Sequence, residues 1–299
     1  MRSILIAPVG VSVFLAASFR GDATPVADPH AGHDADAASM AAAGSQQTAT
    51  LPASNATAAD RLSRSPRHGE WVMVRLGPND SVNTWVVYPE RSDKAPVVLV
   101  IHDNRGITTW SRGVADQLAA DGFIGIAVDL LTMRRKGNLN SAWAVDSVRA
   151  ALGSLTPDEI NRSLDAVAKH GMSLPAALPK YGVVGFCWGG ARSFLHAATA
   201  PTLGAAVVYY GSPPTADQMA AIRAPVLGHY GGNDARINMT IPATDSAMKR
   251  LGKTYEFHIH DGAGHGFLSG QEGANGANAA ASRAAWPRTI AFFRAKLGS

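Results

Sequence analysis

The sequence predicts an α/β fold in which helices cover both faces of a mostly parallel sheet. Continuous apolar runs such as 97–102 and 123–130 are typical of central strands that are buried on both faces. Runs of this kind alternate along the chain with helical stretches, as they do in parallel sheets. The 299 residues are 46% hydrophobic and 17% charged. This length suffices for one large domain, and the composition excludes a disordered or fibrous protein.

Residues 1–23 are predicted to be an export signal. Met1 and Arg2 make a short positive start, 4–17 are almost wholly apolar, and small residues follow, which is the order found in signal peptides. The apolar run is shorter than the roughly 20 residues that span a bilayer. We therefore expect a periplasmic or secreted protein with no stable membrane span after processing. An uncleaved N-terminal anchor is the alternative.

Residues 24–65 are expected to form a disordered linker, followed by one folded domain over 66–299. The linker is rich in Ala, Ser, Thr, Asp and Gly, and such a segment buries too little apolar surface to offset its chain entropy. It contains His30 and His33 beside several aspartates. These side chains would at most bind a divalent metal weakly, since their spacing matches no common ligand pattern. A solvated linker is the favoured interpretation.

Eight β-rich runs are predicted to be strands. The first two flank the turn 77–80, which contains Gly, Pro, Asn and Asp, and so predict a hairpin. The later runs are more continuously apolar, as in a covered parallel sheet. The predicted strands cover residues 71–76, 84–88, 97–102, 123–130, 181–186, 204–210, 225–230 and 255–260.

Helices are expected between these strands and at the end of the chain. Thr156 is a capping residue followed by Pro157 and, three residues after the cap, by Glu159; this pattern predicts a helix that runs to about His170. In the last helical stretch, Pro287 either lies near the middle of one helix or marks a second start. The best-defined helical stretches are 111–121, 157–170, 191–199 and 279–297.

Charge and cysteine content exclude several classes of function. The formal charge is +4, and the densest basic cluster is Arg134, Arg135 and Lys136. No run of five basic residues occurs, so we expect no nucleic-acid partner. Cys187 is the single cysteine. It therefore cannot form an internal disulfide or a cysteine-based zinc site, and any role for it is that of a lone thiol.

The segment 185–190, Gly-Phe-Cys-Trp-Gly-Gly, directly follows one predicted strand and directly precedes a predicted helix. A sharp strand-to-helix turn holds its corner residue in a strained conformation and requires small flanking residues. Gly185 and Gly189 are those flanks, and Cys187 is the corner. A helix N-terminus also favours a thiolate. This pattern predicts a nucleophile, in preference to a buried structural cysteine.

A thiol nucleophile needs a base and an acid that orients the base, and in this turn type the acid precedes the histidine in the chain. Asp234 follows one predicted strand in a glycine loop, and His265 follows the last strand in another. They are the predicted acid and base. Asp261 is the rival acid, and Ser193 is a rival nucleophile that lies a turn into the helix. Four histidines within helices or strands compete less well: His196, His229, His258 and His260.

Together these segments resemble the dienelactone hydrolase family of α/β-hydrolases, from about Trp71 to the C-terminus. The resemblance rests on 185–190, on Tyr209-Tyr210-Gly211, on Gly232-Asn233-Asp234 and on 264–267. It implies the α/β-hydrolase fold and a Cys187, Asp234, His265 triad. It also implies attack on an ester or lactone carbonyl and an acyl-enzyme that water resolves, with no metal or organic cofactor.

The resemblance extends to His102-Asp103-Asn104-Arg105-Gly106. Family members commonly carry Glu where this chain has Asp103, and there the Glu holds and activates the resting thiol. The shorter Asp103 is expected to poise Cys187 in the same way. The backbone N–H of Asn104 would contribute to the oxyanion hole, together with the N–H of Trp188.

The substrate is predicted only as a small ester or lactone. Family members that act on the lactone of aromatic degradation use arginines to hold its carboxylate, one of them shortly after the catalytic histidine. Here the stretch 266–269 has no basic residue. Arg105, Tyr210 and Phe267 are the candidate substrate contacts. A non-hydrolytic ligand- or metal-binding protein on the same fold and an acyltransferase are the alternative functions.

Overall fold

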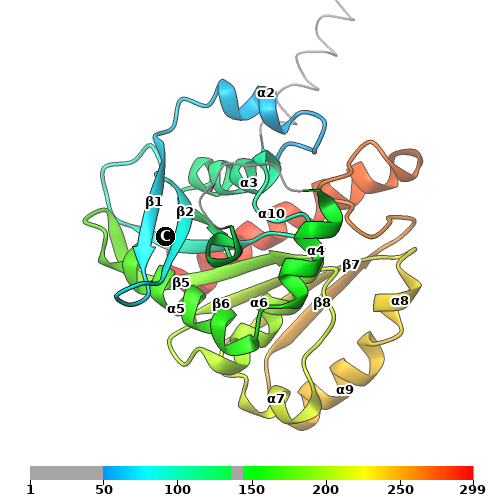
Figure 1. The fold of residues 1–299 in the computed structure, drawn as a ribbon. Coiled ribbons are helices and arrows are strands. Elements are labelled where there is room, and N and C mark those ends of the chain that lie inside the picture. Colours follow the sequence, from blue (N-terminus) through cyan, green and yellow to red (C-terminus); the bar gives the residue numbers. More distant parts are fainter. Residues whose placement is uncertain (1–49, 136–143, 299) are drawn as a thin grey trace, which may run out of the picture. The chain divides into compact units, whose positions relative to one another are not determined.

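The computed structural model describes residues 50–135 and 144–298, and residues 45–299 form one compact unit. One eight-stranded sheet runs through it in the order β1-β2-β4-β3-β5-β6-β7-β8 (Figure 1). The strands are β1 (Gly69–Arg75), β2 (Ser81–Val87), β3 (Ala95–Ile101), β4 (Ile124–Asp129), β5 (Ala177–Phe186), β6 (Ala205–Tyr209), β7 (Val226–Gly231) and β8 (Tyr255–His260).

The sheet is antiparallel at one edge and parallel elsewhere. β1 and β2 form the predicted hairpin, and β2 pairs antiparallel with β4. From β4 to β8 every neighbouring pair is parallel. β3 and β4 are buried along their whole length, which is why their sequences are apolar at successive positions. The predicted mostly parallel sheet is confirmed.

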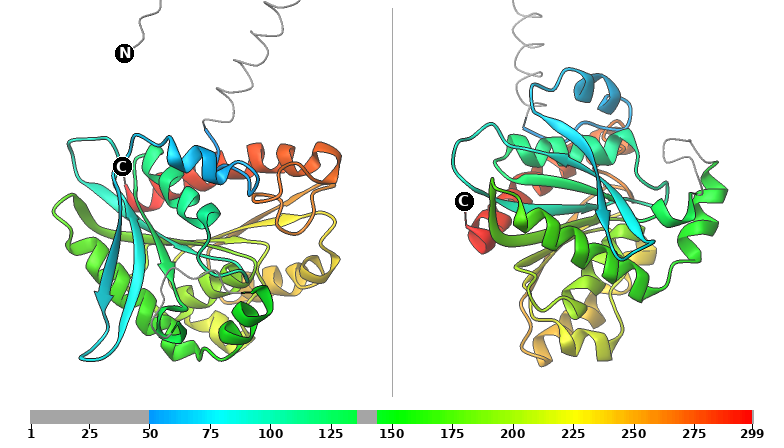
Figure 2. Two further views of the ribbon diagram at one scale, coloured as in Figure 1. Left: turned by 45° about the horizontal axis from the view of Figure 1, so that its top comes forward. Right: turned by 60° about the vertical axis from the view of Figure 1, so that its left-hand side comes forward.

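Helices cover both faces of this sheet, as Figure 2 shows. Alternate residues of β3 point to opposite faces: Val97, Leu99 and Ile101 pack in one apolar cluster, and Val98 and Val100 in another. α5 and α6 contribute to the first cluster, and α3 and α10 to the second. The helices are α2 (Ala58–Ser63), α3 (Thr109–Ala120), α4 (Val145–Gly153), α5 (Pro157–Ser173), α6 (Trp188–Thr199), α7 (Ala216–Ala221), α8 (Ala235–Asn238), α9 (Ile241–Arg250) and α10 (Ala277–Leu297).

The predicted start of α5 is accurate because its capping signal is clear in the sequence, whereas α3 begins at Thr109, two residues before the predicted start. Thr156 accepts from the N–H of Glu159, and Glu159 bonds back to Thr156 N–H, so the expected capping box is present. α6 begins at Trp188, three residues before the predicted start, because its first turn contains two glycines that mask the helical signal. Pro287 lies inside α10 and neither ends nor restarts it.

The predicted linker, 24–65, extends too far along the chain. Leu51 and Ala53 are buried, and Trp110 Nε1 donates to the Ala53 carbonyl over 2.9 Å. Arg61, from α2, donates to Gln117 of α3. A few small apolar residues therefore suffice to order the end of this segment, because side chains of the domain donate hydrogen bonds to its backbone carbonyls.

The predicted signal, 1–23, lies outside the described residues, as do His30, His33 and the rest of the linker up to residue 49. Over residues 50–135 and 144–298, no helix is long and apolar enough to cross a membrane.

Candidate active site

Cys187 occupies a sharp turn between β5 and α6. Its backbone has φ 55° and ψ −113°, a region that is strained for any residue other than glycine. Its N–H donates to the carbonyl of Tyr209 at the end of β6 over 3.0 Å. A Cβ on Gly185 would lie 1.9 Å from the carbonyl oxygen of Gly189, and one on Gly189 would lie 2.3 Å from that of His102. The turn therefore requires its two glycines, as the sequence predicted.

His265 connects the thiol to a buried carboxylate. Its Nδ1 forms a short hydrogen bond with Asp234 Oδ2, and the imidazole lies next to the Cys187 side chain. The neighbouring Cys187 side chain raises the pKa of His265 most, burial opposes this, and the bond to Asp234 raises the pKa further. The structure thus brings the three residues of the predicted triad together, with a hydrogen bond between His265 and Asp234.

The rival residues lie elsewhere. Asp261 is exposed, and it forms no hydrogen bond with His265 in the described chain. Ser193 is fully buried in α6 and donates to the carbonyl of Val207 over 2.9 Å. His196, in α6, bonds to Tyr181 on the buried side of the helix. The geometry therefore favours Cys187 and Asp234 over these alternatives.

Asp103 holds Arg105 in this structure. The Asp103 carboxylate accepts from Arg105 Nε over 3.0 and 3.1 Å to its two oxygens, and from the Arg105 backbone N–H over 2.9 Å. The hydrogen bond to Asp103 is the largest of the causes that raise the pKa of Arg105. Among the described residues, no hydrogen bond joins Asp103 to Cys187. Activation of the thiol by Asp103 stays a prediction.

Two backbone N–H groups near the thiol are unengaged. Within residues 50–135 and 144–298, no protein group accepts from the N–H of Asn104 or of Trp188. Trp188 opens α6, whose first N–H groups have no partner within the helix. Asn104 follows β3, which is the neighbour of β5 in the sheet with Ile101 paired to Gly185. These are the two donors expected of an oxyanion hole.

The candidate substrate contacts differ in their access to solvent. The Arg105 side chain is one-third exposed. Tyr210 is buried at a φ of 42°, with its ring centroid 5.0 Å from that of His265. Phe267 is fully buried behind Tyr210. The Phe267 ring packs into the core in this structure, and its contact with substrate stays a prediction.

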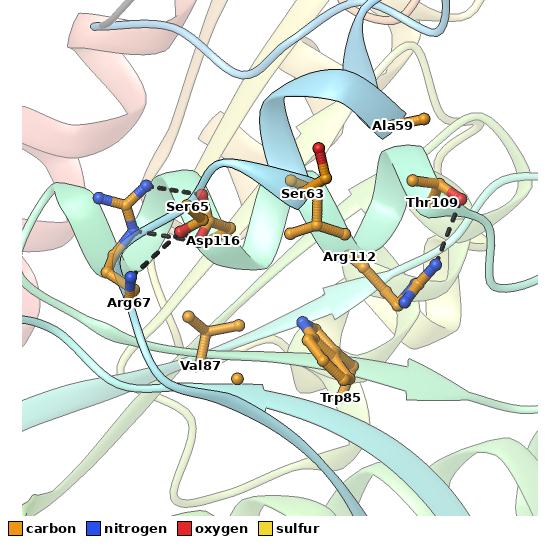
Figure 3. A pocket seen from close by; sticks show the side chains of 11 residues that line it. Ala59, Ser63, Ser65, Arg67, Trp85, Val87, Thr109, Arg112 and Asp116 are labelled. Carbon is orange, nitrogen blue, oxygen red and sulfur yellow. Dashed lines mark hydrogen bonds and ion pairs between the residues drawn. The ribbon is translucent and has the colours of Figure 1, made fainter. Parts of the chain in front are cut away.

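A cavity of about 500 Å³ lies away from the triad, between α2, α3 and the β1–β2 hairpin (Figure 3). Arg67 and Ser65 both donate to Asp116 on one side of it. Trp85 and Arg112 lie on the other, with the guanidinium 5.3 Å from the ring centroid. No triad residue lines this cavity, so we do not assign the reaction to it.

The described part of the chain offers no group of three or more His, Cys, Asp or Glu side chains placed to hold a metal ion. His229 and His260 do approach each other, with 3.2 Å between Nδ1 and Nε2, but both belong to the packed layer between β7 and β8. The side chains suited to catalysis are the thiol, imidazole and carboxylate at the carboxyl ends of the strands. This is the edge where parallel α/β sheets place their sites.

Comparison with known proteins identifies the family. The family model described as "Dienelactone hydrolase family" matches residues 82–297. The chain belongs to the dienelactone hydrolase family. The predicted resemblance, the α/β-hydrolase fold and the class of carboxylic-ester hydrolase are thereby confirmed.

Relatives and solved structures of dienelactone hydrolases match most of the chain. A "Putative carboxymethylenebutenolidase" of Salmonella typhimurium is 29% identical over 82% of this chain and 97% of its own length. The crystal structure of a "Putative Dienelactone Hydrolase" from Klebsiella pneumoniae has a TM-score of 0.67 at 25% identity, covering 76% of this chain and 98% of that one. A dienelactone hydrolase from Anabaena variabilis, 21% identical with a TM-score of 0.60, covers 77% of this chain and 99% of that one, and shows the fold alone.

Proposed function

We propose that this dienelactone hydrolase-like enzyme cleaves small esters or lactones through Cys187, His265 and Asp234. The observation that carries the proposal is the hydrogen bond between His265 and the buried Asp234 carboxylate, with the imidazole next to the Cys187 thiol. A nucleophile, its base and the group that orients the base are what covalent catalysis requires. Asp234 accepts from Nδ1 and so leaves Nε2 of His265 for the thiol.

The reaction begins when His265 takes the thiol proton and the Cys187 sulfur attacks the substrate carbonyl. A C–S bond forms, and the carbonyl π electrons move onto oxygen. The N–H groups of Asn104 and Trp188 stabilise this oxyanion. When the intermediate collapses, the C–O bond to the alcohol breaks, and the leaving oxygen receives the proton from His265.

Water then resolves the acyl-enzyme. His265 removes a proton from the water as its oxygen attacks the thioester carbonyl, and the same two N–H groups stabilise the second oxyanion. The C–S bond breaks, the carboxylic acid leaves, and the sulfur recovers its proton from His265. With a lactone, the alcohol and the acid remain in one open-chain product.

The acyl half is proposed to be small, and Arg105 is the basic group that could meet a negative charge on it. Arg105 is already paired with Asp103, and residues 266–269 contain no basic side chain. These features support neutral or singly charged esters and lactones as the substrates. The lactone named in carboxymethylenebutenolidase relatives belongs to the substrate panel that should be tested.

Turnover of a panel of chromogenic short-chain esters, lactones and thioesters tests the proposal. We expect Cys187→Ala to abolish turnover, and Cys187→Ser to fall by two or more orders of magnitude, because serine is a much weaker nucleophile at the pKa of its hydroxyl. Since the chain has one cysteine, alkylation by iodoacetamide should inactivate the enzyme in step with labelling. Retained turnover in Cys187→Ala would contradict the proposal. Product analysis with added alcohols would reveal acyl transfer in place of hydrolysis.

We also propose that the enzyme acts after export, on the basis of the charged start and apolar run in residues 1–23. N-terminal sequencing of protein recovered from the periplasmic fraction of an expressing bacterium tests this. A mature N-terminus beyond the apolar run is expected. An intact Met1 in the cytoplasmic or membrane fraction would contradict export with cleavage.

A further inference from the structure

His102 contacts both halves of the proposed oxyanion hole. It follows the last residue of β3 and is 1% exposed. Its Nδ1 lies 2.8 Å from the carbonyl oxygen of Asp103, and its ring stacks on that of Trp188, with the centroids 5.7 Å apart and the planes 10° from parallel. Neither contact is part of the triad.

The hydrogen bond to Asp103 fixes the peptide unit that also carries the Asn104 N–H. A carbonyl oxygen only accepts, so Nδ1 of His102 must carry the proton. There are no cis peptide bonds in the described chain, and in a trans peptide the C=O and N–H point in opposite directions. Holding the Asp103 carbonyl toward His102 therefore turns the Asn104 N–H away from His102 and leaves it unengaged.

The second contact acts on the other donor. Trp188 is the residue directly after the nucleophile, and its own backbone N–H is unengaged at the start of α6. The helix start also rests on the backbone of His102, since a Cβ on Gly189 would lie 2.3 Å from the His102 carbonyl oxygen. The same residue thus meets α6 through its ring and through its main chain.

Burial holds the His102 ring in one protonation state. Desolvation is the main cause that lowers its pKa, opposed by the bond to the Asp103 backbone and by the charges of Asp129 and Asp103, while Arg135 lowers it further. Nε2 is buried with no hydrogen-bond partner in the described structure. The ring is therefore neutral with its proton on Nδ1, which is the tautomer that the Asp103 carbonyl requires.

We propose that His102 is a positioning residue that aligns the two oxyanion donors with each other. Its Nδ1–H sets the direction of the Asn104 N–H, and its ring braces Trp188 at the nucleophile turn. His102 transfers no proton and touches no reacting atom. The inference rests on the proposed function, because it concerns the oxyanion hole of the same reaction.

Two substitutions separate the contacts. His102→Phe keeps a stacking ring and removes the donor, whereas His102→Asn keeps a nitrogen donor on the same carbon and removes the ring. We expect kcat of His102→Phe to fall at least tenfold with little change in KM, approaching the 10²–10³-fold loss typical of deleting one oxyanion donor. We expect His102→Asn to recover most of that loss.

The rate of Cys187 alkylation by iodoacetamide distinguishes a positioning role from a merely structural one. If His102 only maintained the structure of the site, its substitution would change this rate. This displacement requires the thiolate and forms no oxyanion, so its rate constant should be the same in wild type, His102→Phe and His102→Asn. Three outcomes would overturn the inference: wild-type kcat in His102→Phe, a parallel fall in alkylation and turnover, or no advantage of Asn over Phe.

Nitrogen-15 NMR of the histidine rings tests the geometry without turnover. The signal of His102, assigned by its absence in His102→Asn, should be that of a neutral ring protonated on Nδ1 from pH 5 to 8. A charged ring or an Nε2 proton would overturn the inference. Failure of the proposed function has a different signature, namely no ester turnover by wild type or unchanged turnover by Cys187→Ala.

Discussion

Cys187 has an unfavourable backbone conformation at the corner of the turn between β5 and α6. A positive φ costs a residue other than glycine on the order of 1–3 kcal/mol, and the surroundings must hold it there. The N–H bond to Tyr209 and the close packing of Gly185 against Gly189 do so. The side chain is thereby held at the corner, where His265 meets it.

Asp234 is expected to raise the rate of turnover by orienting the imidazole of His265. We expect Asp234→Asn to reduce kcat by about 10²–10⁴-fold, because the amide would favour the wrong tautomer of the imidazole. Alkylation of Cys187 should slow as well, since the bond to Asp234 is one of the causes that raise the pKa of His265. Steady-state kinetics and timed iodoacetamide labelling measure both effects.

Asp261→Asn is the matched control for this prediction. Asp261 lies four residues before His265 and is exposed, so its variant should retain wild-type kcat and wild-type labelling. A large loss in Asp261→Asn with little effect in Asp234→Asn would reverse the assignment of the acid.

At the scale of elements, apolar runs predicted the strands because a strand covered on both faces has no polar side to interrupt it. The hairpin, the parallel order and the elbow followed from the same local signals. The ordering of 50–63 did not, since it depends on donors elsewhere in the domain: the side chains of Trp110 and Gln271 donate hydrogen bonds to backbone carbonyls of this segment. The bond between Arg105 and Asp103 was likewise invisible, because it is set by side-chain geometry within a turn.

The segment before β1 should contribute measurably to stability. Leu51 is 5% exposed in the cluster beneath α3, and replacing a buried leucine by alanine typically costs about 2–5 kcal/mol. We expect Leu51→Ala to lower Tm by several degrees in calorimetry. The control Arg64→Ala removes an ion pair with Asp60 that is largely exposed, which should cost less than about 1 kcal/mol. Equal Tm values for the two variants would show that the segment does not pack as described.

At the scale of the whole molecule, the buried histidines link folding to pH. Burial is the largest cause that lowers the pKa of His196 and of His260 from 6.5 to about 4. Both are therefore neutral in the folded chain at pH values where the unfolded chain binds protons. Their stabilising effect is complete above pH 6.5 and is lost as the pH falls toward 4.

We expect Tm to decline between pH 6.5 and 4 more steeply in wild type than in His196→Gln, which removes one of these groups. His68 is exposed, and His68→Gln is the control that should follow the wild-type curve. Thermal unfolding in a series of buffers at constant ionic strength measures the difference. Superimposable plots of Tm against pH for wild type and His196→Gln would contradict a lowered pKa of His196 in the folded chain.

β3 and β5 are neighbours in the sheet, with Ile101 opposite Gly185, yet β4 and the helices α3, α4 and α5 lie between them in the chain. One proposed oxyanion donor follows β3, and the proposed nucleophile follows β5. Contacts between segments so distant in sequence form late, after the intervening loop entropy has been overcome. Recovery of esterase activity after dilution from denaturant should therefore lag behind the recovery of helical circular dichroism, so that turnover marks the completion of the central strand pairing.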